Sequence, residues 1–436
     1  MHSLKQVLKV KKMRNKLLFT LLMVACVRLG SQIPVPGIDL TYFKEWFQNN
    51  ANSTLNFFSA FTGGSFERFS IFGLGITPYI TASIIIQLLT IAIPSLDELR
   101  KDGDYGKKKM DWINRSTAIG LAVLESLAMA IGFGRSGLLP NMALLRAIFV
   151  VLFLTGGTAL LILMGWAIDK KGIGNGISII LMVNIITGIP QDFAVLYERF
   201  VKSETLAKGI LNSCVIVALV AVLVMLVVLL NEGYRKIPIQ YSNGLPGKKI
   251  PEGQRSSLPI KVNVANVMPV IFASTLLSIP QMIASIAGRG YGGGISAYIL
   301  NMVNQNNWFD MSHPQYSVGL LLYLAMVFFF AFFYTSISFN PMEIADNLKK
   351  QGAAIPGIRQ GKPTEKYLQN IIEHLVVIGA TGLIIVVMIP LFFSSVFHAS
   401  LSFGGTSIII IVGVILETLE QSKSEMQIHE YKSFLW

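Results

Sequence analysis

Long apolar segments recur along almost the whole chain, and their lengths constrain the fold more than any other feature. A membrane-spanning α-helix needs roughly 20 apolar residues, and because a bilayer holds no water to hydrogen-bond the backbone, such segments span as helices. The sequence therefore predicts an all-α, polytopic membrane protein with ten transmembrane helices, and a hydrophobic content of 53% excludes a soluble fold. The predicted spans are residues 17–33, 72–93, 117–133, 147–168, 177–189, 210–230, 264–284, 318–337, 375–393 and 407–416.

A short motif occurs twice, as Pro-Tyr-Ile-Thr-Ala-Ser at 78–83 and Pro-Val-Ile-Phe-Ala-Ser at 269–274. The two copies lie in the second and seventh spans, which are equivalent places in two sets of five. This position indicates a duplicated unit. Because five crossings is an odd number, the second copy has the opposite orientation in the membrane. We therefore expect two inverted halves, residues 1–205 and 206–436, with a site or path near the midplane between them.

The net charge of +12 is compatible with nucleic-acid binding, but the positions of the basic residues favour a membrane protein. With the N-terminus inside, the N-terminal arm, the even-numbered loops and the tail hold about 27 Lys and Arg, against about 8 in the odd-numbered loops. The positive-inside rule then predicts that both termini are cytoplasmic. Direct DNA binding is not expected, since it would require basic residues interleaved with exposed aromatic residues on one face.

Motifs for catalysis or cofactor binding are sparse. No GxxxxGK[ST] phosphate-binding loop occurs, so ATP-driven work would have to come from a partner. Cys26 and Cys214 both fall in predicted spans, and the five histidines lack metal-ligand spacing. We predict no enzyme, no metal site and no cofactor. The first span follows a basic stretch, as in a signal peptide, but Arg28 favours a retained helix.

Polar groups inside the spans are few, although they would mark transport chemistry. Glu125 lies in the middle of the third span, and one acid does not form an ion site. We expect Glu125 to make an interhelical hydrogen bond and Arg28 to have an architectural role. An ion-coupled small-molecule transporter remains the alternative function.

Aliphatic side chains dominate the predicted midplane. Ile76 and Ile80 share one helical face through their i, i+4 spacing, and Ile271 follows the proline of the second motif copy. The fifth and tenth spans are short and occupy matching places in the halves, which indicates that they border the path. A ring of such residues would exclude water without holding an ion; ordinary packing is the alternative for each isoleucine.

The apolar segment 55–61 is too short to cross the membrane and ends at two glycines. It could re-enter the membrane as a stopper, or rest on the outer interface as an amphipathic helix.

The chain resembles the SecY family, whose members are the central subunit of the bacterial protein-conducting channel, along essentially its whole length. The resemblance rests on specific motifs that occur in the family's order. They are Arg28-Leu29-Gly30, residues 33–37 (IPVPG), 75–89 (GITPYITASIIIQLL), 172–178 (GIGNGIS), 258–263 (LPIKVN), 339–341 (FNP) with 345–350 (ADNLKK), 356–359 (PGIR) and 403–407 (FGGTS).

This resemblance implies an hourglass channel that translocates unfolded preproteins across the plasma membrane and releases apolar segments sideways into it. Its waist, the pore ring, would consist of Ile76, Ile80, Ile177, Leu181, Ile271 and Ile410, with Leu181 at a position where isoleucine is commoner. The plug would be residues 55–66, including Leu55, Phe57, Phe58 and Phe61. A lateral gate would open between the second and third helices and the seventh and eighth, near Ile84, Gln87, Leu88, Ser274 and Leu277.

The resemblance also implies partners. The cytoplasmic loops at about 231–263 and 341–368 would receive the SecA motor ATPase or the ribosome, which drive this passive channel. The docking residues would be Arg235, Lys236, Lys248, Lys249 and Arg359. SecE and SecG subunits, signal-bearing preproteins and membrane lipids complete the expected partners. Gln360 stands where proline often follows that arginine, so we expect a less rigid loop tip.

Overall fold

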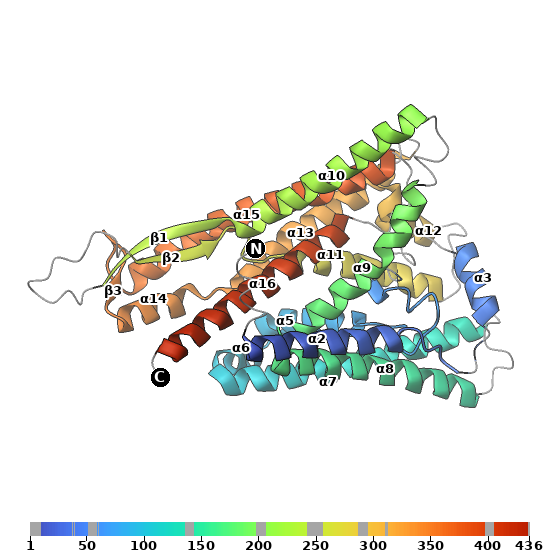
Figure 1. The fold of residues 1–436 in the computed structure, drawn as a ribbon, viewed down its shortest axis with the longest axis horizontal. Coiled ribbons are helices and arrows are strands. Elements are labelled where there is room, and N and C mark those ends of the chain that lie inside the picture. The colour runs from blue at the N-terminus through green and yellow to red at the C-terminus, as the bar shows by residue number, and fades with distance from the viewer. Residues whose placement is uncertain are drawn as a thin grey trace, which may run out of the picture.

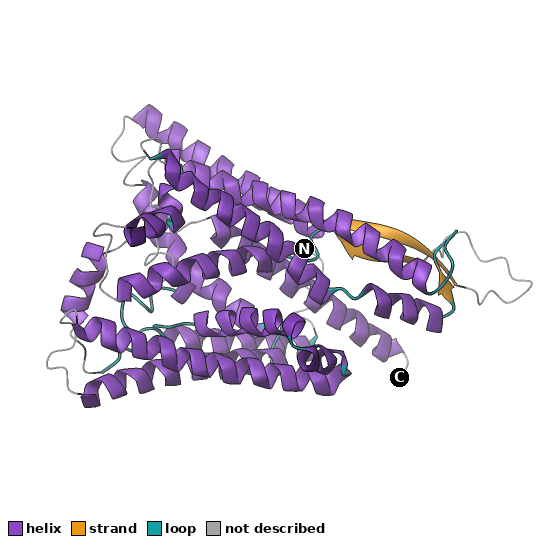
Figure 2. Ribbon diagram, turned by 180° about the vertical axis from the view of Figure 1, so that it is seen from behind, coloured by secondary structure: helices purple, strands orange, loops and turns teal. Residues whose placement is uncertain are grey.

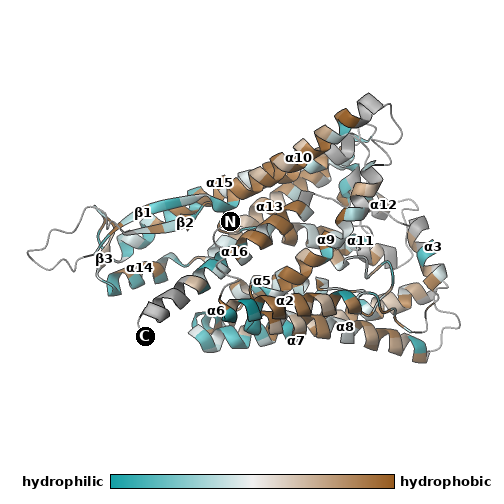
Figure 3. Ribbon diagram, viewed as in Figure 1, coloured by the Kyte–Doolittle hydropathy of each residue, from teal (hydrophilic) through white to brown (hydrophobic). Residues whose placement is uncertain are grey.

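The computed structural model describes residues 10–36, 38, 40–50, 59, 61–135, 144–197, 206–241, 256–286, 295–309, 313–396 and 405–434. These residues form an elongated bundle of helices, with a small β-sheet projecting from one end (Figure 1). The view from behind shows that the strands are confined to that end (Figure 2). Hydrophobic residues gather along the middle of the bundle, while the end that carries β1, β2 and α14 is hydrophilic (Figure 3).

A helix overlaps each of the ten predicted spans. By length and composition, five helices in the described residues could cross a membrane, or up to six if α5 and α6 (Pro94–Lys101), which meet at a bend of 103°, count as one span. Shorter apolar helices cover Gly176–Pro190 and Met268–Gln281. The ten helices are α2 (Lys11–Gly30), α5 (Thr77–Ala92), α7 (Gly103–Arg135), α8 (Leu144–Lys171), α9 (Gly176–Tyr197), α10 (Leu206–Glu232), α11 (Met268–Ile286), α13 (Ser317–Ser338), α15 (Lys362–Val396) and α16 (Gly405–Phe434).

The pattern of helix contacts repeats along the chain. In the first five of these helices, α5 packs on α7, α7 on α8 and α8 on α9, while α2 contacts both α8 and α9. In the second five, α11 packs on α13, α13 on α15 and α15 on α16, while α10 contacts both α15 and α16. The two sets meet where α11 contacts α5 and α7, and where α16 contacts α9.

Helix α5 begins at Thr77, five residues later than the predicted start of the second span. The preceding residues form turns, because Gly75 has a left-handed φ of +59° that a helix cannot continue. A Cβ at Gly75 would also lie 2.9 Å from the Cγ2 atom of Thr62, so the close approach requires glycine. Pro78 then fits the first turn of the helix, where no backbone donor is needed.

The small sheet joins the two cytoplasmic loops that the sequence predicted. Strands β1 (Tyr234–Tyr241), β2 (Ser256–Lys261) and β3 (Ala353–Ala354) are antiparallel in the order β2-β1-β3. Ile237 and Ile239 alternate with exposed residues along β1 and are buried. Ile237 packs in a cluster with Leu368 of α15, and Ile239 in one with Leu348 of α14 (Pro341–Lys350). These contacts hold the sheet on α14 and α15.

Short elements lie near the opposite end of the bundle (Figure 1). Helix α3 (Leu40–Asn50) places Phe43 edge-on against Phe69 and Phe133, with ring centroids 4.9 and 5.4 Å apart. Helix α12 (Ile295–Val303) and the 3-10 turns η2 (Gln305–Asn307) and η3 (Pro314–Tyr316) pack beside α13.

Candidate pore ring, plug and docking surface

One large buried hydrophobic cluster draws side chains from nine of the ten helices. Five of the six predicted pore-ring residues are members of this cluster, and Ile177 packs against it while half-buried. Ile76 immediately precedes α5 and Ile80 lies on it, while Ile177 and Leu181 come from α9, Ile271 from α11, and Ile410 from α16. All six residues therefore lie in or against the same cluster, and the pore ring itself stays a prediction.

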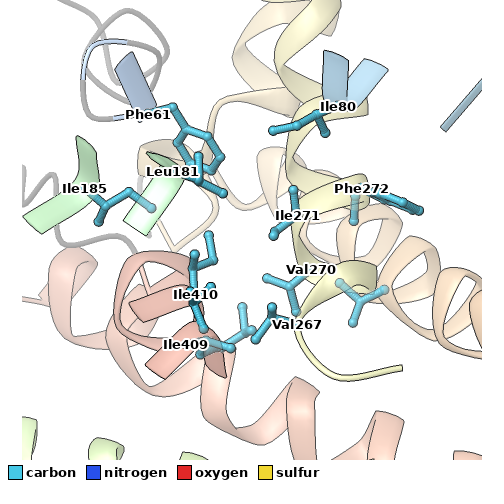
Figure 4. Close-up of a cluster of buried hydrophobic side chains, with 14 of the residues drawn as sticks. Phe61, Ile80, Leu181, Ile185, Val267, Val270, Ile271, Phe272, Ile409 and Ile410 are labelled. Atoms are coloured by element: carbon cyan, nitrogen blue, oxygen red, sulfur yellow. The ribbon is translucent and has the colours of Figure 1, made fainter. Parts of the chain in front are cut away.

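The close-up in Figure 4 shows how these side chains lie. Ile80, Leu181, Ile271 and Ile410 approach from different helices and point toward one another, and the ring of Phe61 lies beside Leu181. Aliphatic side chains make no directional bonds, so such a cluster excludes water through dispersion contacts and burial alone. It also offers no charge that could hold an ion.

Phe61 is the predicted plug residue that the structure describes, because Leu55, Phe57 and Phe58 lie outside the described residues. Its side chain is 5% exposed and belongs to the same cluster as the pore ring. Its backbone carbonyl accepts a hydrogen bond from the amide of Asn184 on α9, at 3.3 Å. Nearby, the Thr62 hydroxyl donates to the carbonyl of Ser59 at 3.1 Å and accepts from the amide of Phe66 at 3.2 Å, which fixes the turn after Phe61.

The predicted gate residues occupy different environments. Ile84 on α5 and Leu277 on α11 are both buried in the same cluster as the predicted pore-ring residues, and these two helices contact each other. Ser274 hydrogen-bonds the hydroxyl of Tyr323 at 3.3 Å and so joins α11 to α13. Gln87 donates to Ser83 of its own helix, and Leu88 is exposed.

Basic residues line the small β-sheet and the loop after β3. Arg235 and Lys236 are exposed on β1, and Arg359 is exposed in the loop between β3 and α15. Lys248 and Lys249 fall between β1 and β2 and lie outside the described residues. Gln360 donates from its side-chain amide to the carbonyl of Ala353 at 3.2 Å, so this residue ties the loop to β3 where a less rigid tip was expected.

A polar cluster that was not predicted from the sequence connects the base of the sheet to α16. Glu420 accepts hydrogen bonds from the hydroxyl of Tyr234, at 2.6 Å, and from the ammonium group of Lys261. Tyr234 and Lys261 are paired residues of β1 and β2. Farther along α16, Glu425 forms an ion pair of 2.6 Å with Lys16 of α2.

The two charged residues considered within the spans, Arg28 and Glu125, differ in their hydrogen bonding. Arg28 of α2 hydrogen-bonds Asn184, at 3.3 Å, and Thr187, both on α9, and so joins two helices as expected. The Oε2 atom of Glu125 is buried without a hydrogen-bond partner in the described part of the chain, so the predicted interhelical hydrogen bond is not found at this atom. No group of three or more His, Cys, Asp or Glu side chains among the described residues could hold a metal ion.

Solved structures with the same arrangement of helices define the class of protein. A structure described as a protein conducting channel has a TM-score of 0.64 and 19% sequence identity, with 95% of this chain and 92% of that chain covered. Sec61 in the canine ribosome-channel complex from the endoplasmic reticulum has a TM-score of 0.62 and 18% identity, with the same coverage. The fold is thus that of the membrane channels of the SecY and Sec61 type.

The sequence comparisons narrow the class to a family. A sequence model of the SecY family matches residues 70–419. Relatives named protein translocase subunit SecY are 38% identical over 436 residues in Bacillus subtilis (strain 168), with 98% of each chain covered, and 37% identical over 436 residues in Escherichia coli (strain K12), with 97% of this chain and 94% of the relative covered. The chain belongs to the SecY family.

Proposed function

We propose that this chain is the channel through which unfolded preproteins cross the plasma membrane and from which apolar segments pass sideways into the lipid. The observation that carries the proposal is the buried cluster that includes Phe61 of the plug segment and five of the predicted pore-ring residues, with the sixth, Ile177, packed against it. Family membership and the channel fold support the same function.

The chemistry of the pore ring suits a conduit that must accept many sequences. At rest, the aliphatic side chains close on one another and on Phe61, and water and ions are excluded. When the plug segment moves away, the same side chains can close around a passing chain. Because they make no hydrogen bonds, they do not trap particular residues of that chain.

Sideways release follows from the contact between α5 and α11, where Ile84 and Leu277 are buried in one cluster. If these helices separate, a segment in the pore meets lipid. Each Leu, Ile, Phe or Val then gains about 0.3 to 0.6 kcal/mol at the centre of a membrane helix. A stretch of about 20 apolar residues therefore leaves through the gate, while polar segments continue through the pore.

The proposal includes two inverted halves, residues 1–205 and 206–436, which the repeated pattern of helix contacts supports. Both termini are placed in the cytoplasm, because basic residues concentrate in the N-terminal arm and the even-numbered loops. The exposed Arg235, Lys236 and Arg359 then lie on the cytoplasmic side.

These basic residues form the proposed docking surface for the SecA motor ATPase or the ribosome, either of which would supply the driving force. SecE and SecG are the expected membrane subunits. Opposite charge on the partner would accelerate encounter and fix its orientation.

Reconstitution tests this function directly. Vesicles that contain the chain with SecE and SecG should import a signal-bearing preprotein into a protease-protected space when SecA and ATP are added. A preprotein that remains fully protease-sensitive, with SecA bound to the vesicles and hydrolysing ATP, would contradict the proposal.

The ion-coupled transporter considered from the sequence is not favoured, because the family and the fold are those of protein-conducting channels. Saturable uptake of a small solute by the purified chain alone would be the evidence needed to favour the transporter.

A further inference from the structure

One buried amide connects three separate parts of the chain. Asn184 lies on α9 and is 3% exposed. Its Nδ2 atom donates to the backbone carbonyl of Phe61 at 3.3 Å, and its Oδ1 atom accepts from Nη1 of Arg28 on α2 at 3.3 Å. The plug segment, the first helix and a pore-lining helix therefore meet at this side chain.

A second set of contacts fixes the orientation of this amide. Thr187, one turn farther along α9, accepts a hydrogen bond from Nη2 of Arg28, and its hydroxyl donates to the carbonyl of Asn184 at 2.6 Å. Arg28 is therefore held by two residues of α9. With its oxygen occupied by the guanidinium group, the amide of Asn184 presents its N–H group to the plug segment.

The chain just after Phe61 passes directly over this pair. Gly63 has a φ of +65°, and a Cβ there would lie 2.7 Å from Nη1 of Arg28 and 3.0 Å from the Cα atom of Asn184. A side chain at this position would separate the plug segment from α2 and α9. Glycine at position 63 thus permits the close approach in which the side-chain amide of Asn184 hydrogen-bonds the backbone of the plug segment.

We propose that Asn184 is a positioning residue that latches the plug segment in the closed channel through its hydrogen bond to the carbonyl of Phe61. This inference rests on the proposed function, in which that segment seals the pore. A hydrogen bond to a backbone carbonyl does not depend on the side chains of the plug. When the plug leaves, both groups can bond water, so the net preference for the closed state is modest and the latch is readily released.

A purely structural role is the competing explanation, since polar side chains also hold membrane helices together. In that case the bond from Arg28 to Asn184 would matter, and the bond from Asn184 to Phe61 would be incidental. Two substitutions separate these roles. Asn184→Ala removes both bonds, whereas Asn184→Asp keeps an acceptor for Arg28 but removes the donor to Phe61.

The experiment measures the resting ion conductance of the complete channel complex in planar bilayers. Loss of the latch should raise the open fraction by about tenfold, as expected for one buried hydrogen bond. Both Asn184→Ala and Asn184→Asp should show this rise. Wild-type conductance in Asn184→Asp, or in both variants, would overturn the latch.

Asn231→Ala is the matched control, because Asn231 is also buried and its Oδ1 atom accepts from Asn263 at 2.8 Å, far along the chain from the plug segment. The melting temperature of Asn231→Ala should fall about as much as that of Asn184→Ala, but its resting ion conductance should not rise. An equal leak in Asn231→Ala would show that general destabilisation opens the channel, and the latch would be rejected.

Deletion of residues 55–66 distinguishes failure of the latch from failure of the function on which it rests. A leak in the deletion variant, with unchanged conductance in both Asn184 variants, would reject the latch and retain the plug. A deletion variant that stays sealed would reject the plug itself and the latch with it, while preprotein import would still test the channel function.

Discussion

The hydroxyl of Tyr234 donates a hydrogen bond of 2.6 Å to Oε1 of Glu420, which joins the first residue of β1 to α16. Lys261, the partner of Tyr234 in β2, donates to the other oxygen of the same carboxylate. Ile410 of the pore ring lies on the same helix, ten residues or about 15 Å along its axis from Glu420. The base of the sheet proposed for docking is thereby connected to a helix of the proposed pore ring.

This connection should depend on pH. Burial alone would raise the pKa of Glu420, but hydrogen bonds from Lys261 and Tyr234 hold that pKa below its usual value of 4.5. The stabilisation is therefore present above pH 4.5 and is lost as the pH falls through the lowered value. Hydrogen exchange of the β1 amides should show weaker protection in acid for the wild type and a flatter profile for Glu420→Gln. An unchanged profile in Glu420→Gln would contradict this assignment.

Ionisation of Tyr234 should disrupt the same contact at high pH. Its hydrogen bond to Glu420, followed by burial, raises its pKa from 10 to about 12. The contribution of the tyrosine is complete below pH 10 and is lost as the pH rises through about 12. Absorbance titration of the tyrosinate should lose one late-titrating group in Tyr234→Phe; loss of a group that titrates near pH 10 instead would show that Tyr234 ionises normally.

Replacing a pore-ring isoleucine should make the resting channel leak. Ile80→Gly or Ile271→Gly removes a buried side chain from the cluster that closes the path, so ion conductance in planar bilayers should increase. Ile91→Gly is the control, because Ile91 lies on the same helix as Ile80 but is 61% exposed on its outer surface. Equal conductance of Ile80→Gly and Ile91→Gly would remove Ile80 from the pore ring.

Reversing the charge of Arg359 should impair docking of the cytoplasmic partner. The side chain is exposed, so Arg359→Glu should leave membrane insertion and thermal stability unchanged. Preprotein import driven by SecA should fall by about tenfold or more if the arginine meets an acidic group on the partner. Lys109→Glu, an exposed charge reversal on α7 outside the two docking loops, is the control. Normal import by Arg359→Glu would exclude this residue from the docking surface.

Gly319 should be required for stability. A Cβ at this position of α13 would lie 1.7 Å from the carbonyl oxygen of Met302 and 2.6 Å from the indole nitrogen of Trp308, so α12 could not pack as it does. Gly319→Ala should lower the free energy of unfolding by about 1 to 3 kcal/mol. In contrast, a Cβ at Gly120 of α7 would meet nothing within 4 Å, and Gly120→Ala should be neutral or slightly stabilising by its helix propensity. Equal melting temperatures for both variants would contradict the argument.

Much of the fold could be predicted from the sequence, because membrane spans are recognised by length and hydrophobicity. Each predicted span overlaps a helix, and the six residues of the predicted pore ring lie in or against one large buried cluster. The β-sheet was not predicted, although Ile237 and Ile239 alternate with polar residues in β1. That alternation is too short to distinguish a strand from a loop without β3, which comes from more than a hundred residues later.

The polar contacts were the least predictable part of the site. Asn184 stands in a short apolar span, which is a recognisable signal of an important residue, but its partners come from α2 and the plug segment. The bond from Tyr234 to Glu420 likewise links residues 186 positions apart. Such pairings arise from tertiary packing, and the local pattern of either residue contains no information about the other.

The predicted pore-ring residues lie on or just before α5, and on α9, α11 and α16, while contacts between the two helix sets include α5 with α11 and α9 with α16. The helices of the proposed constriction therefore also form two seams between the two sets. A rotation that parts one seam while the other acts as a pivot would widen the aperture and uncover a side exit in the same movement. The same rigid-body movement would then open both the route across the membrane and the route into the lipid.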